Sequence, residues 1–68
     1  MIGTVTIFRI AEGFGFVMSN NGEMRSAKFA VTDIVSDPAK IEPGCTVRYT
    51  EVRELGSHAL RAANVQRI

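Results

Sequence analysis

Two phenylalanines, Phe14 and Phe16, are the side chains of this sequence best suited to hold a ligand. If the residues around them form a β-strand, positions i and i+2 point to the same side, so the two rings form an aromatic platform on one face. Gly13 and Gly15 alternate with the rings and leave space beside them. If the platform faces solvent, it suits flat ligands, most commonly unpaired nucleotide bases. If it faces inward, the two rings are simply part of the core.

Little else in the sequence points to chemistry. The single cysteine, Cys45, excludes an internal disulfide and is expected to be buried, and the single histidine, His58, excludes the usual zinc spacings. No nucleophile has a recognisable base, and no acidic pair stands at a telling spacing. Gly13-Phe14-Gly15 continues into a strand rather than opening a phosphate-binding helix. We therefore expect a protein that is not an enzyme and that uses no cofactor and no metal.

Charge and hydropathy limit the class of partner. Eight Lys and Arg residues against seven Asp and Glu residues give a net charge of +1, so any attraction for a polyanion must be local. No apolar run approaches the roughly 18 to 20 residues of a membrane span, and the first residues lack the pattern of a signal peptide. We expect one domain over residues 1–68, located in the cytoplasm and away from membranes.

Apolar alternation predicts short strands and little helix. Cys45, Val47 and Tyr49 alternate with polar neighbours, which is typical of a strand with one buried face. The expected strands span residues 2–9, 14–18, 27–31, 45–50 and 59–66. Asn21-Gly22 predicts a tight turn between the second and third strands, residues 32–34 a single helical turn, and residues 36–38 a loop. So many short strands in one small chain favour a closed barrel, because closure removes unprotected sheet edges.

Several segments of the chain follow one known pattern in the right order. Gly13-Phe14-Gly15-Phe16-Val17 has the form of a first ribonucleoprotein motif, and Gly3-Thr4-Val5 followed by Phe8 has the form of an opening strand. The other matching segments are residues 32–34, 41–49 and 62–65. In these segments the chain resembles the bacterial cold-shock domain. The resemblance implies an all-β fold, a small five-stranded antiparallel OB-type barrel, that binds single-stranded RNA or DNA.

Residues 25–31 correspond to the family's second ribonucleoprotein motif in one of two registers. One register places residues 26, 28 and 29 at the family's Phe, His and final Phe positions. The register that we prefer places residues 28, 30 and 31 there and makes Ala27 the first core residue. Because the registers differ by two residues, every side chain keeps its face. In both registers Lys28 faces the platform, and the family's Phe and His are lost.

Further departures from the family's pattern weaken the expected binding. The family's opening Lys-Trp-Phe is Thr6-Ile7-Phe8 here, Glu12 stands in place of a lysine, and Pro38 stands roughly where a loop aromatic is common. Stacking of a base on an aromatic ring contributes about 1–3 kcal/mol to binding, so the lost rings weaken binding by more than one added lysine strengthens it. We expect binding to single strands on the order of a hundredfold or more weaker than the family's pattern would give.

The candidate binding residues surround the platform: Phe14, Phe16, Phe8, Ile7, Lys28 and Arg9. The platform rings would stack on bases, Ile7 and Phe8 would extend the platform, and the two cations would attract the sugar-phosphate backbone. Phe8 has the alternative role of bracing the barrel, and the cations that of ordinary solvated charges. The alternative function is a protein-interaction module, in which the more apolar platform contacts another protein or a second copy in a homodimer.

Overall fold

The computed structural model describes residues 1–20, 25–53, 56 and 59–68. Its strands and single 3₁₀ turns are β1 (Ile2–Arg9), β2 (Phe14–Ser19), β3 (Ser26–Ala30), η1 (Val31–Asp33), η2 (Pro38–Lys40), β4 (Thr46–Arg53) and β5 (Leu60–Arg67). All the predicted strands are confirmed, with shifts at their ends, and the expected helical turn is η1. The predicted Asn21-Gly22 turn and His58 lie outside the described residues.

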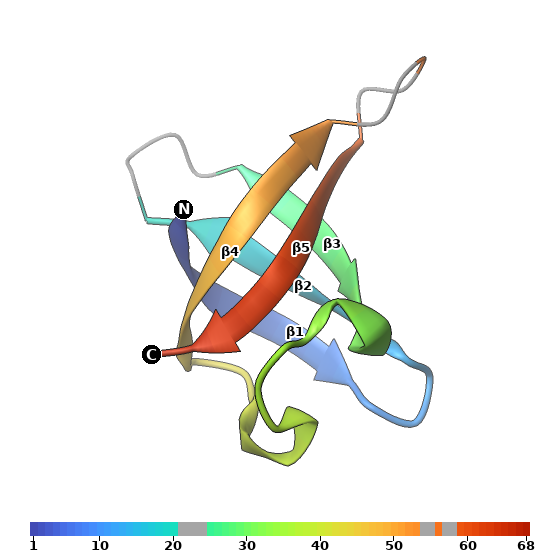
Figure 1. The fold of residues 1–68 in the computed structure, drawn as a ribbon, viewed down its shortest axis with the longest axis vertical. Coiled ribbons are helices and arrows are strands. Elements are labelled where there is room, and N and C mark those ends of the chain that lie inside the picture. Colours follow the sequence, from blue (N-terminus) through green and yellow to red (C-terminus); the bar gives the residue numbers. More distant parts are fainter. Residues whose placement is uncertain (21–24, 54–55, 57–58) are drawn as a thin grey trace.

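The strands close into a barrel in the order β1-β2-β3-β5-β4 (Figure 1). Neighbouring strands are antiparallel except β3 and β5, which run parallel and meet at Lys28 and Arg61. An odd number of strands makes one parallel contact unavoidable, because alternating directions cannot match around a closed ring of five. The all-β fold and the small OB-type barrel are thus confirmed, with this one parallel contact.

The core is built from the inward-facing positions of the strands and from Ile41 and Cys45, which precede β4. Side chains two apart on a strand share a face, so the alternation seen in the sequence buries Cys45, Val47 and Tyr49 as predicted. Ala27 is also a core residue, as expected, and Phe29 is the largest side chain that is almost fully buried. The buried apolar residues are Val5, Val17, Ala27, Phe29, Ile41, Cys45, Val47, Tyr49, Ala62 and Val65.

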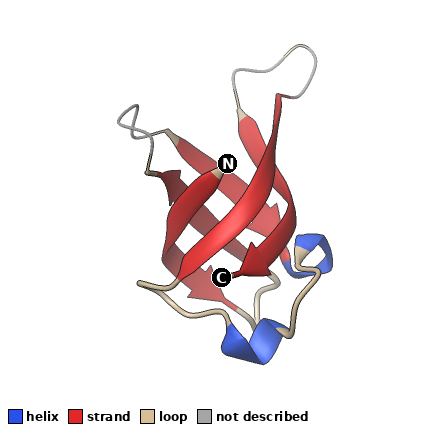
Figure 2. Ribbon diagram, turned by 60° about the vertical axis from the view of Figure 1, so that its left-hand side comes forward, coloured by secondary structure: helices blue, strands red, loops and turns tan. Residues whose placement is uncertain are grey.

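A helical turn follows directly on the loop predicted near Asp37. The Asp37 carboxylate accepts a hydrogen bond from the backbone N–H of Ala39 at 3.0 Å. Pro38 occupies the first turn of η2, where its missing N–H leaves no partner unsatisfied. The turns η1 and η2 lie at the same end of the barrel and carry the chain from β3 to β4 (Figure 2).

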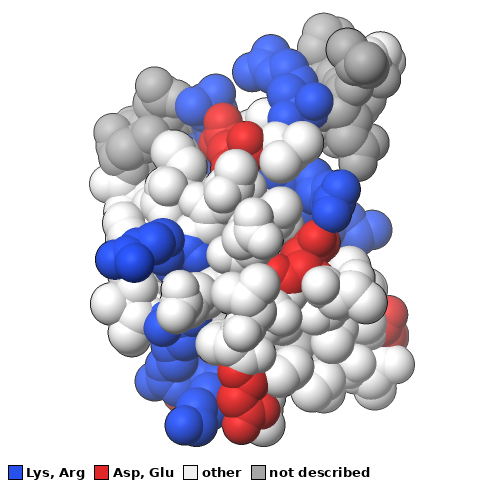
Figure 3. All heavy atoms as spheres, in the orientation of Figure 1, with Lys and Arg blue, Asp and Glu red and all other residues white. Residues whose placement is uncertain are grey.

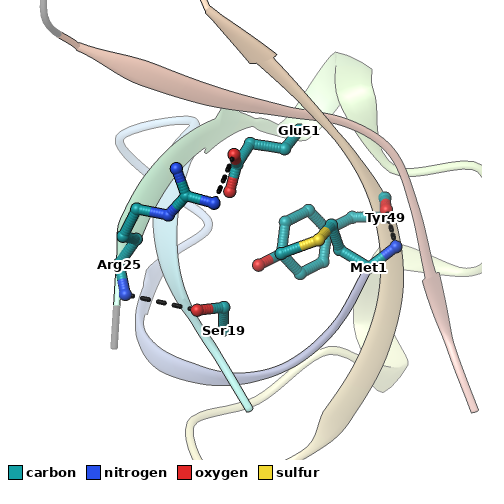
Figure 4. Close-up of polar contacts among 5 residues, drawn as sticks. All are labelled: Met1, Ser19, Arg25, Tyr49 and Glu51. Atoms are coloured by element: carbon teal, nitrogen blue, oxygen red, sulfur yellow. Dashed lines mark hydrogen bonds and ion pairs between the residues drawn. The ribbon is translucent and has the colours of Figure 1, made fainter. Parts of the chain in front are cut away.

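Polar groups from β2, β4 and the residues that precede β1 and β3 lie close together in the barrel (Figure 4). The Arg25 guanidinium lies 3.3 Å from the Glu51 carboxylate, and the Arg25 backbone N–H donates to the Ser19 hydroxyl at 3.2 Å. The Met1 ammonium donates to the Tyr49 carbonyl at 2.9 Å. The Tyr49 hydroxyl is buried and has no hydrogen-bond partner among the described residues. Burial raises the pKa of this hydroxyl, because an apolar interior disfavours the phenolate.

Tyr49→Phe is expected to raise the free energy of unfolding by about 1 kcal/mol, because an unpaired buried hydroxyl costs about 1–3 kcal/mol and phenylalanine keeps the ring. For a domain of this size the gain corresponds to a rise in Tm of about 4–8 °C, which thermal unfolding would measure. Tyr49→Leu is the control, since it removes part of the packed ring as well and should lower the Tm. A lower Tm for Tyr49→Phe would mean that the hydroxyl is hydrogen-bonded, contrary to the prediction.

Candidate nucleic-acid interface

The cross-strand register gathers most of the predicted site residues on one surface. Two rows of side chains cross β1, β2 and β3: Ile7, Phe16 and Lys28 in one row, and Arg9, Phe14 and Ala30 in the next. Residues directly opposite each other in an antiparallel sheet share a face. Ile7, Arg9 and Lys28 are exposed, and the two rings are half-buried. We call this surface the outer face.

A bulge in β1 decides which side chains reach the outer face. Val5 lies opposite Val17, but the next paired residue is Ile7 opposite Phe16, so Thr6 is an extra residue in β1. Because of the extra residue, Thr6 and Ile7 are both exposed. In a regular strand Ile7 would share the inward side of Val5.

Phe8 lies on the other side of the sheet from the platform. It pairs with Gly15, and its half-buried ring packs on Phe29 with a centroid distance of 5.8 Å. Of the two roles weighed for Phe8, bracing the barrel is the one that agrees with this position. We therefore leave Phe8 out of the candidate interface.

Gly15 is a packing requirement of the site. A Cβ atom at Gly15 would lie 2.6 Å from Cζ of Phe29 and 2.7 Å from the carbonyl oxygen of Ile7. Gly15 therefore faces the barrel interior, where the core ring of Phe29 fills the space, and the prediction that Gly15 leaves space beside the platform rings is wrong. Gly13 is required for a different reason: its backbone has a φ of +83°, in the left-handed region that favours glycine.

The two platform rings stand edge to face. The centroids of Phe14 and Phe16 are 6.0 Å apart, and the ring planes meet at 87°. This geometry is favourable for an aromatic pair, so each ring holds the other in place. A base would stack on the face of one ring and meet the other ring as a wall, rather than find two parallel stacking surfaces.

Lys28 occupies one side of the platform. Its Nζ lies 5.1 Å from the centroid of the Phe14 ring, in a cation–π contact. At exposed sites such a contact is worth about 0.5–1 kcal/mol, whereas base stacking is worth about 1–3 kcal/mol. A stacked base would therefore displace the ammonium from the ring and leave it free to approach the sugar-phosphate backbone.

The positive charge near the platform is modest. The Arg9 guanidinium lies 4.0 Å from the Glu12 carboxylate, and both side chains are well exposed, so the pair adds little stability. The carboxylate does reduce the positive potential at Arg9. Figure 3 draws the side of the barrel on which β4 and β5 lie in front of β1, β2 and β3, and on that side basic and acidic side chains are interspersed. With a net charge of only +1, attraction for a polyanion must be local.

A pocket that the sequence did not predict opens between β3 and β5. Among the described residues, β3 and β5 share one register pair, Lys28 and Arg61, and the pocket opens beside it. The pocket has a volume of about 330 Å³, at the low end of the range for small-molecule sites. It is lined by Lys28, Phe29, Ala30, Asp33, Ala59, Leu60 and Arg61. Lys28 belongs both to this pocket and to the outer face.

Asp33 is the most buried charged group of the pocket wall. Its Oδ1 accepts a hydrogen bond from the Arg61 guanidinium at 2.7 Å, and its Oδ2 accepts one from the Ala30 backbone N–H at 2.9 Å. The carboxylate side chain is only 9% exposed. The hydrogen bond from Arg61 is the main cause that lowers the pKa of the Asp33 carboxyl. No local sequence pattern signals this pair, because 28 residues separate its members.

The lowered pKa of Asp33 predicts a loss of stability in acid. The carboxyl has a pKa near 3.8 in the unfolded chain and a lower pKa in the folded chain. Its contribution to the free energy of unfolding is therefore fully present above a pH of about 4. The contribution falls as the pH drops through the folded pKa. Urea unfolding should therefore separate wild type from Asp33→Asn at neutral pH, and the two should converge at low pH. A difference that stays constant with pH would contradict this role for the Asp33 charge.

Comparisons with known proteins do not assign the chain to a family. A scan against protein-family models found no match, and neither did a search of curated proteins. Within residues 1–20, 25–53, 56 and 59–68, no group of three or more His, Cys, Asp or Glu could hold a metal ion. In the same part of the chain, no helix has the length and apolar character needed to cross a membrane.

Proposed function

We propose that this protein binds single-stranded nucleic acid, RNA or DNA, on the outer face of β1, β2 and β3, without catalysing a reaction. The observation that supports this most is the pair of rings, Phe14 and Phe16, paired across the strands with exposed residues and flanked by Lys28. Strand-borne rings are a common platform for unpaired bases. The proposal agrees with the resemblance to the bacterial cold-shock domain. Binding would hold a strand open or compete with duplex formation.

The affinity is expected to be low for a protein of this kind. The platform offers two perpendicular rings instead of a continuous aromatic surface, and Ile7 and Ala30 stand beside them. The local cations are few, and Glu12 lies beside Arg9. Each missing ring removes a stacking contact worth about 1–3 kcal/mol.

The test is a titration of the protein with short oligo-U strands, followed through backbone amide shifts at low and moderate salt. Under the proposal the shifts cluster at residues 7–16 and 26–30, saturate, and weaken as salt increases, because binding releases counterions. Amide shifts that stay absent at low salt, or that spread evenly over the barrel, would sink the proposal.

Lys28→Gln should reduce the salt dependence of binding. For single strands, each phosphate contact contributes about 0.7 to the slope of log affinity against log salt, so the variant's slope should be shallower by about 0.7. Lys40→Gln is the matched control, because it makes the same change on η2, away from the outer face. Fluorescence anisotropy with labelled oligo-U over a salt series measures both slopes. Equal slopes in wild type and Lys28→Gln would exclude a phosphate contact of Lys28.

A second candidate function is self-association or binding of another protein through the outer face. The observation in its favour is the exposed apolar side chain of Ile7, 43% accessible and paired with Phe16. Sedimentation would then detect a dimer or heavier species that Phe16→Ser disperses. A clean monomer at high concentration would count against self-association.

A further inference from the structure

The pocket between β3 and β5 continues the outer face. Lys28 sits over the Phe14 ring and also lines the pocket. Neighbouring strands in a sheet are about 4.8 Å apart, so the pocket begins one strand beyond the platform strand β2. A strand stacked on the platform and running across β3 would bring its next nucleotide over the pocket.

The pocket wall combines an apolar floor with a buried acceptor. Ala30 and Leu60, both half-buried, supply the accessible apolar surface on which a flat ring can pack, and the buried Phe29 ring lies behind them. The carboxylate of Asp33 is more than nine-tenths buried and is held in place by Arg61 and the Ala30 N–H. Each carboxylate oxygen can accept more than one hydrogen bond, so Asp33 retains acceptor capacity toward a ligand. An ionised carboxylate donates none.

We propose that this pocket takes one base of the bound strand and selects bases that present an amino group to Asp33. The inference rests on the proposed function. Cytosine, adenine and guanine carry an exocyclic amino group that can donate to the Asp33 carboxylate. Uracil and thymine have a carbonyl oxygen in place of cytosine's amino group, and their one ring N–H donor lies between two carbonyl oxygens that the carboxylate repels. The pocket's volume of about 330 Å³ suits a single base rather than a longer segment. Lys28 and Arg61, which pair across β3 and β5, lie where the flanking phosphates would pass.

Oligo-C and oligo-U provide a matched pair of probes, because cytosine and uracil are the same size and differ only at two neighbouring positions. Cytosine has an amino group and an unprotonated N3 where uracil has a carbonyl oxygen and an N3–H. The affinities of the wild-type protein for the two strands, at equal length and salt, give the selectivity. We expect oligo-C to bind about tenfold more tightly, as one hydrogen bond to a buried charged group allows. Oligo-C should also shift the amides of Leu60 and Arg61, beyond the region affected by stacking alone.

Two variants test whether the preference arises in the pocket. Asp33→Asn replaces the acceptor with an amide that can both donate and accept, so the ratio of affinities should fall to about one. Ala59→Leu narrows the pocket from the β5 side without removing the Asp33 carboxylate, and it should also abolish the preference. Ala39→Leu is the matched control, since it makes the same change at an exposed alanine on η2 and should leave the ratio unchanged.

The outcomes separate the pocket from the platform. Equal affinities for oligo-C and oligo-U, with amide shifts at residues 7–16, would overturn the pocket proposal and leave the proposed function standing. A preference for oligo-C that survives both Asp33→Asn and Ala59→Leu would also overturn it. If the wild-type protein binds neither oligo-C nor oligo-U, the proposed function is overturned, and the pocket proposal with it.

Discussion

Replacing Phe14 and Phe16 together by serine is expected to weaken the binding of short oligo-U strands about thirtyfold or more. Each base that stacks on an aromatic ring contributes about 1–3 kcal/mol, so two lost rings remove at least about 2 kcal/mol. The effect on folding should be small, because both rings are half-buried on the outer face rather than part of the core. Anisotropy titrations with labelled oligo-U, together with thermal unfolding of the same variant, measure both quantities.

The single variants add a further test of the platform. The rings pack edge to face, so removing either one also frees the other. Each single variant should therefore lose more than half of the binding free energy that the double variant loses. Val35→Ser is the matched control, since it removes an exposed apolar side chain outside the outer face and outside the pocket. Binding by Phe14→Ser/Phe16→Ser that equals binding by Val35→Ser would contradict the stacking mode.

Gly15→Ala should cause the largest loss of stability of any single methyl addition near the site. The new Cβ would lie 2.6 Å from the Phe29 ring and 2.7 Å from a backbone oxygen, and neither neighbour can move away easily. Overpacking of this kind costs about 1–3 kcal/mol, a large share of the roughly 3–10 kcal/mol expected for a domain of this size. The Tm should fall by about 4–24 °C, since each kcal/mol corresponds to about 4–8 °C in a domain of this size.

A double-mutant cycle separates crowding from other causes. Phe29→Leu removes the ring atoms that the new methyl would meet, so Gly15→Ala should cost less in that background than in wild type. Gly13→Ala is the contrasting control, because its cost comes from a φ of +83° with no atom within 4 Å, and Phe29→Leu should not relieve it. Additive losses for Gly15→Ala and Phe29→Leu would exclude crowding against Phe29.

The strands and the closed barrel follow from the sequence because they depend on local signals. Alternation at Cys45, Val47 and Tyr49 specifies a buried face that the structure confirms, and the same holds for Ala27 and Phe29 in β3. Glycine spacing around Phe14 and Phe16 correctly indicated a strand with two rings on one side. The sequence signal was weaker at the strand ends, where β3 gives way to η1 at Val31.

The site was less predictable because one bulge changes which side chains of β1 point outward. Ile7 and Phe8 were both expected beside the platform, yet adjacent strand residues face opposite sides. Which one reaches the outer face depends on the extra residue at Thr6, and no residue type in that stretch marks a bulge. The pairing of Asp33 with Arg61 was equally hidden, because it forms only when β5 closes against β3.

Intermolecular NOEs in the complex with oligo-U provide the most direct measurement of the central claim, that bases stack on the outer face. Stacking predicts NOEs from the uracil H5 and H6 protons to the ring protons of Phe14 and Phe16, and none to the core ring of Phe29. A saturated complex whose NOEs lie on another face of the barrel, or that has none to either platform ring, would contradict it.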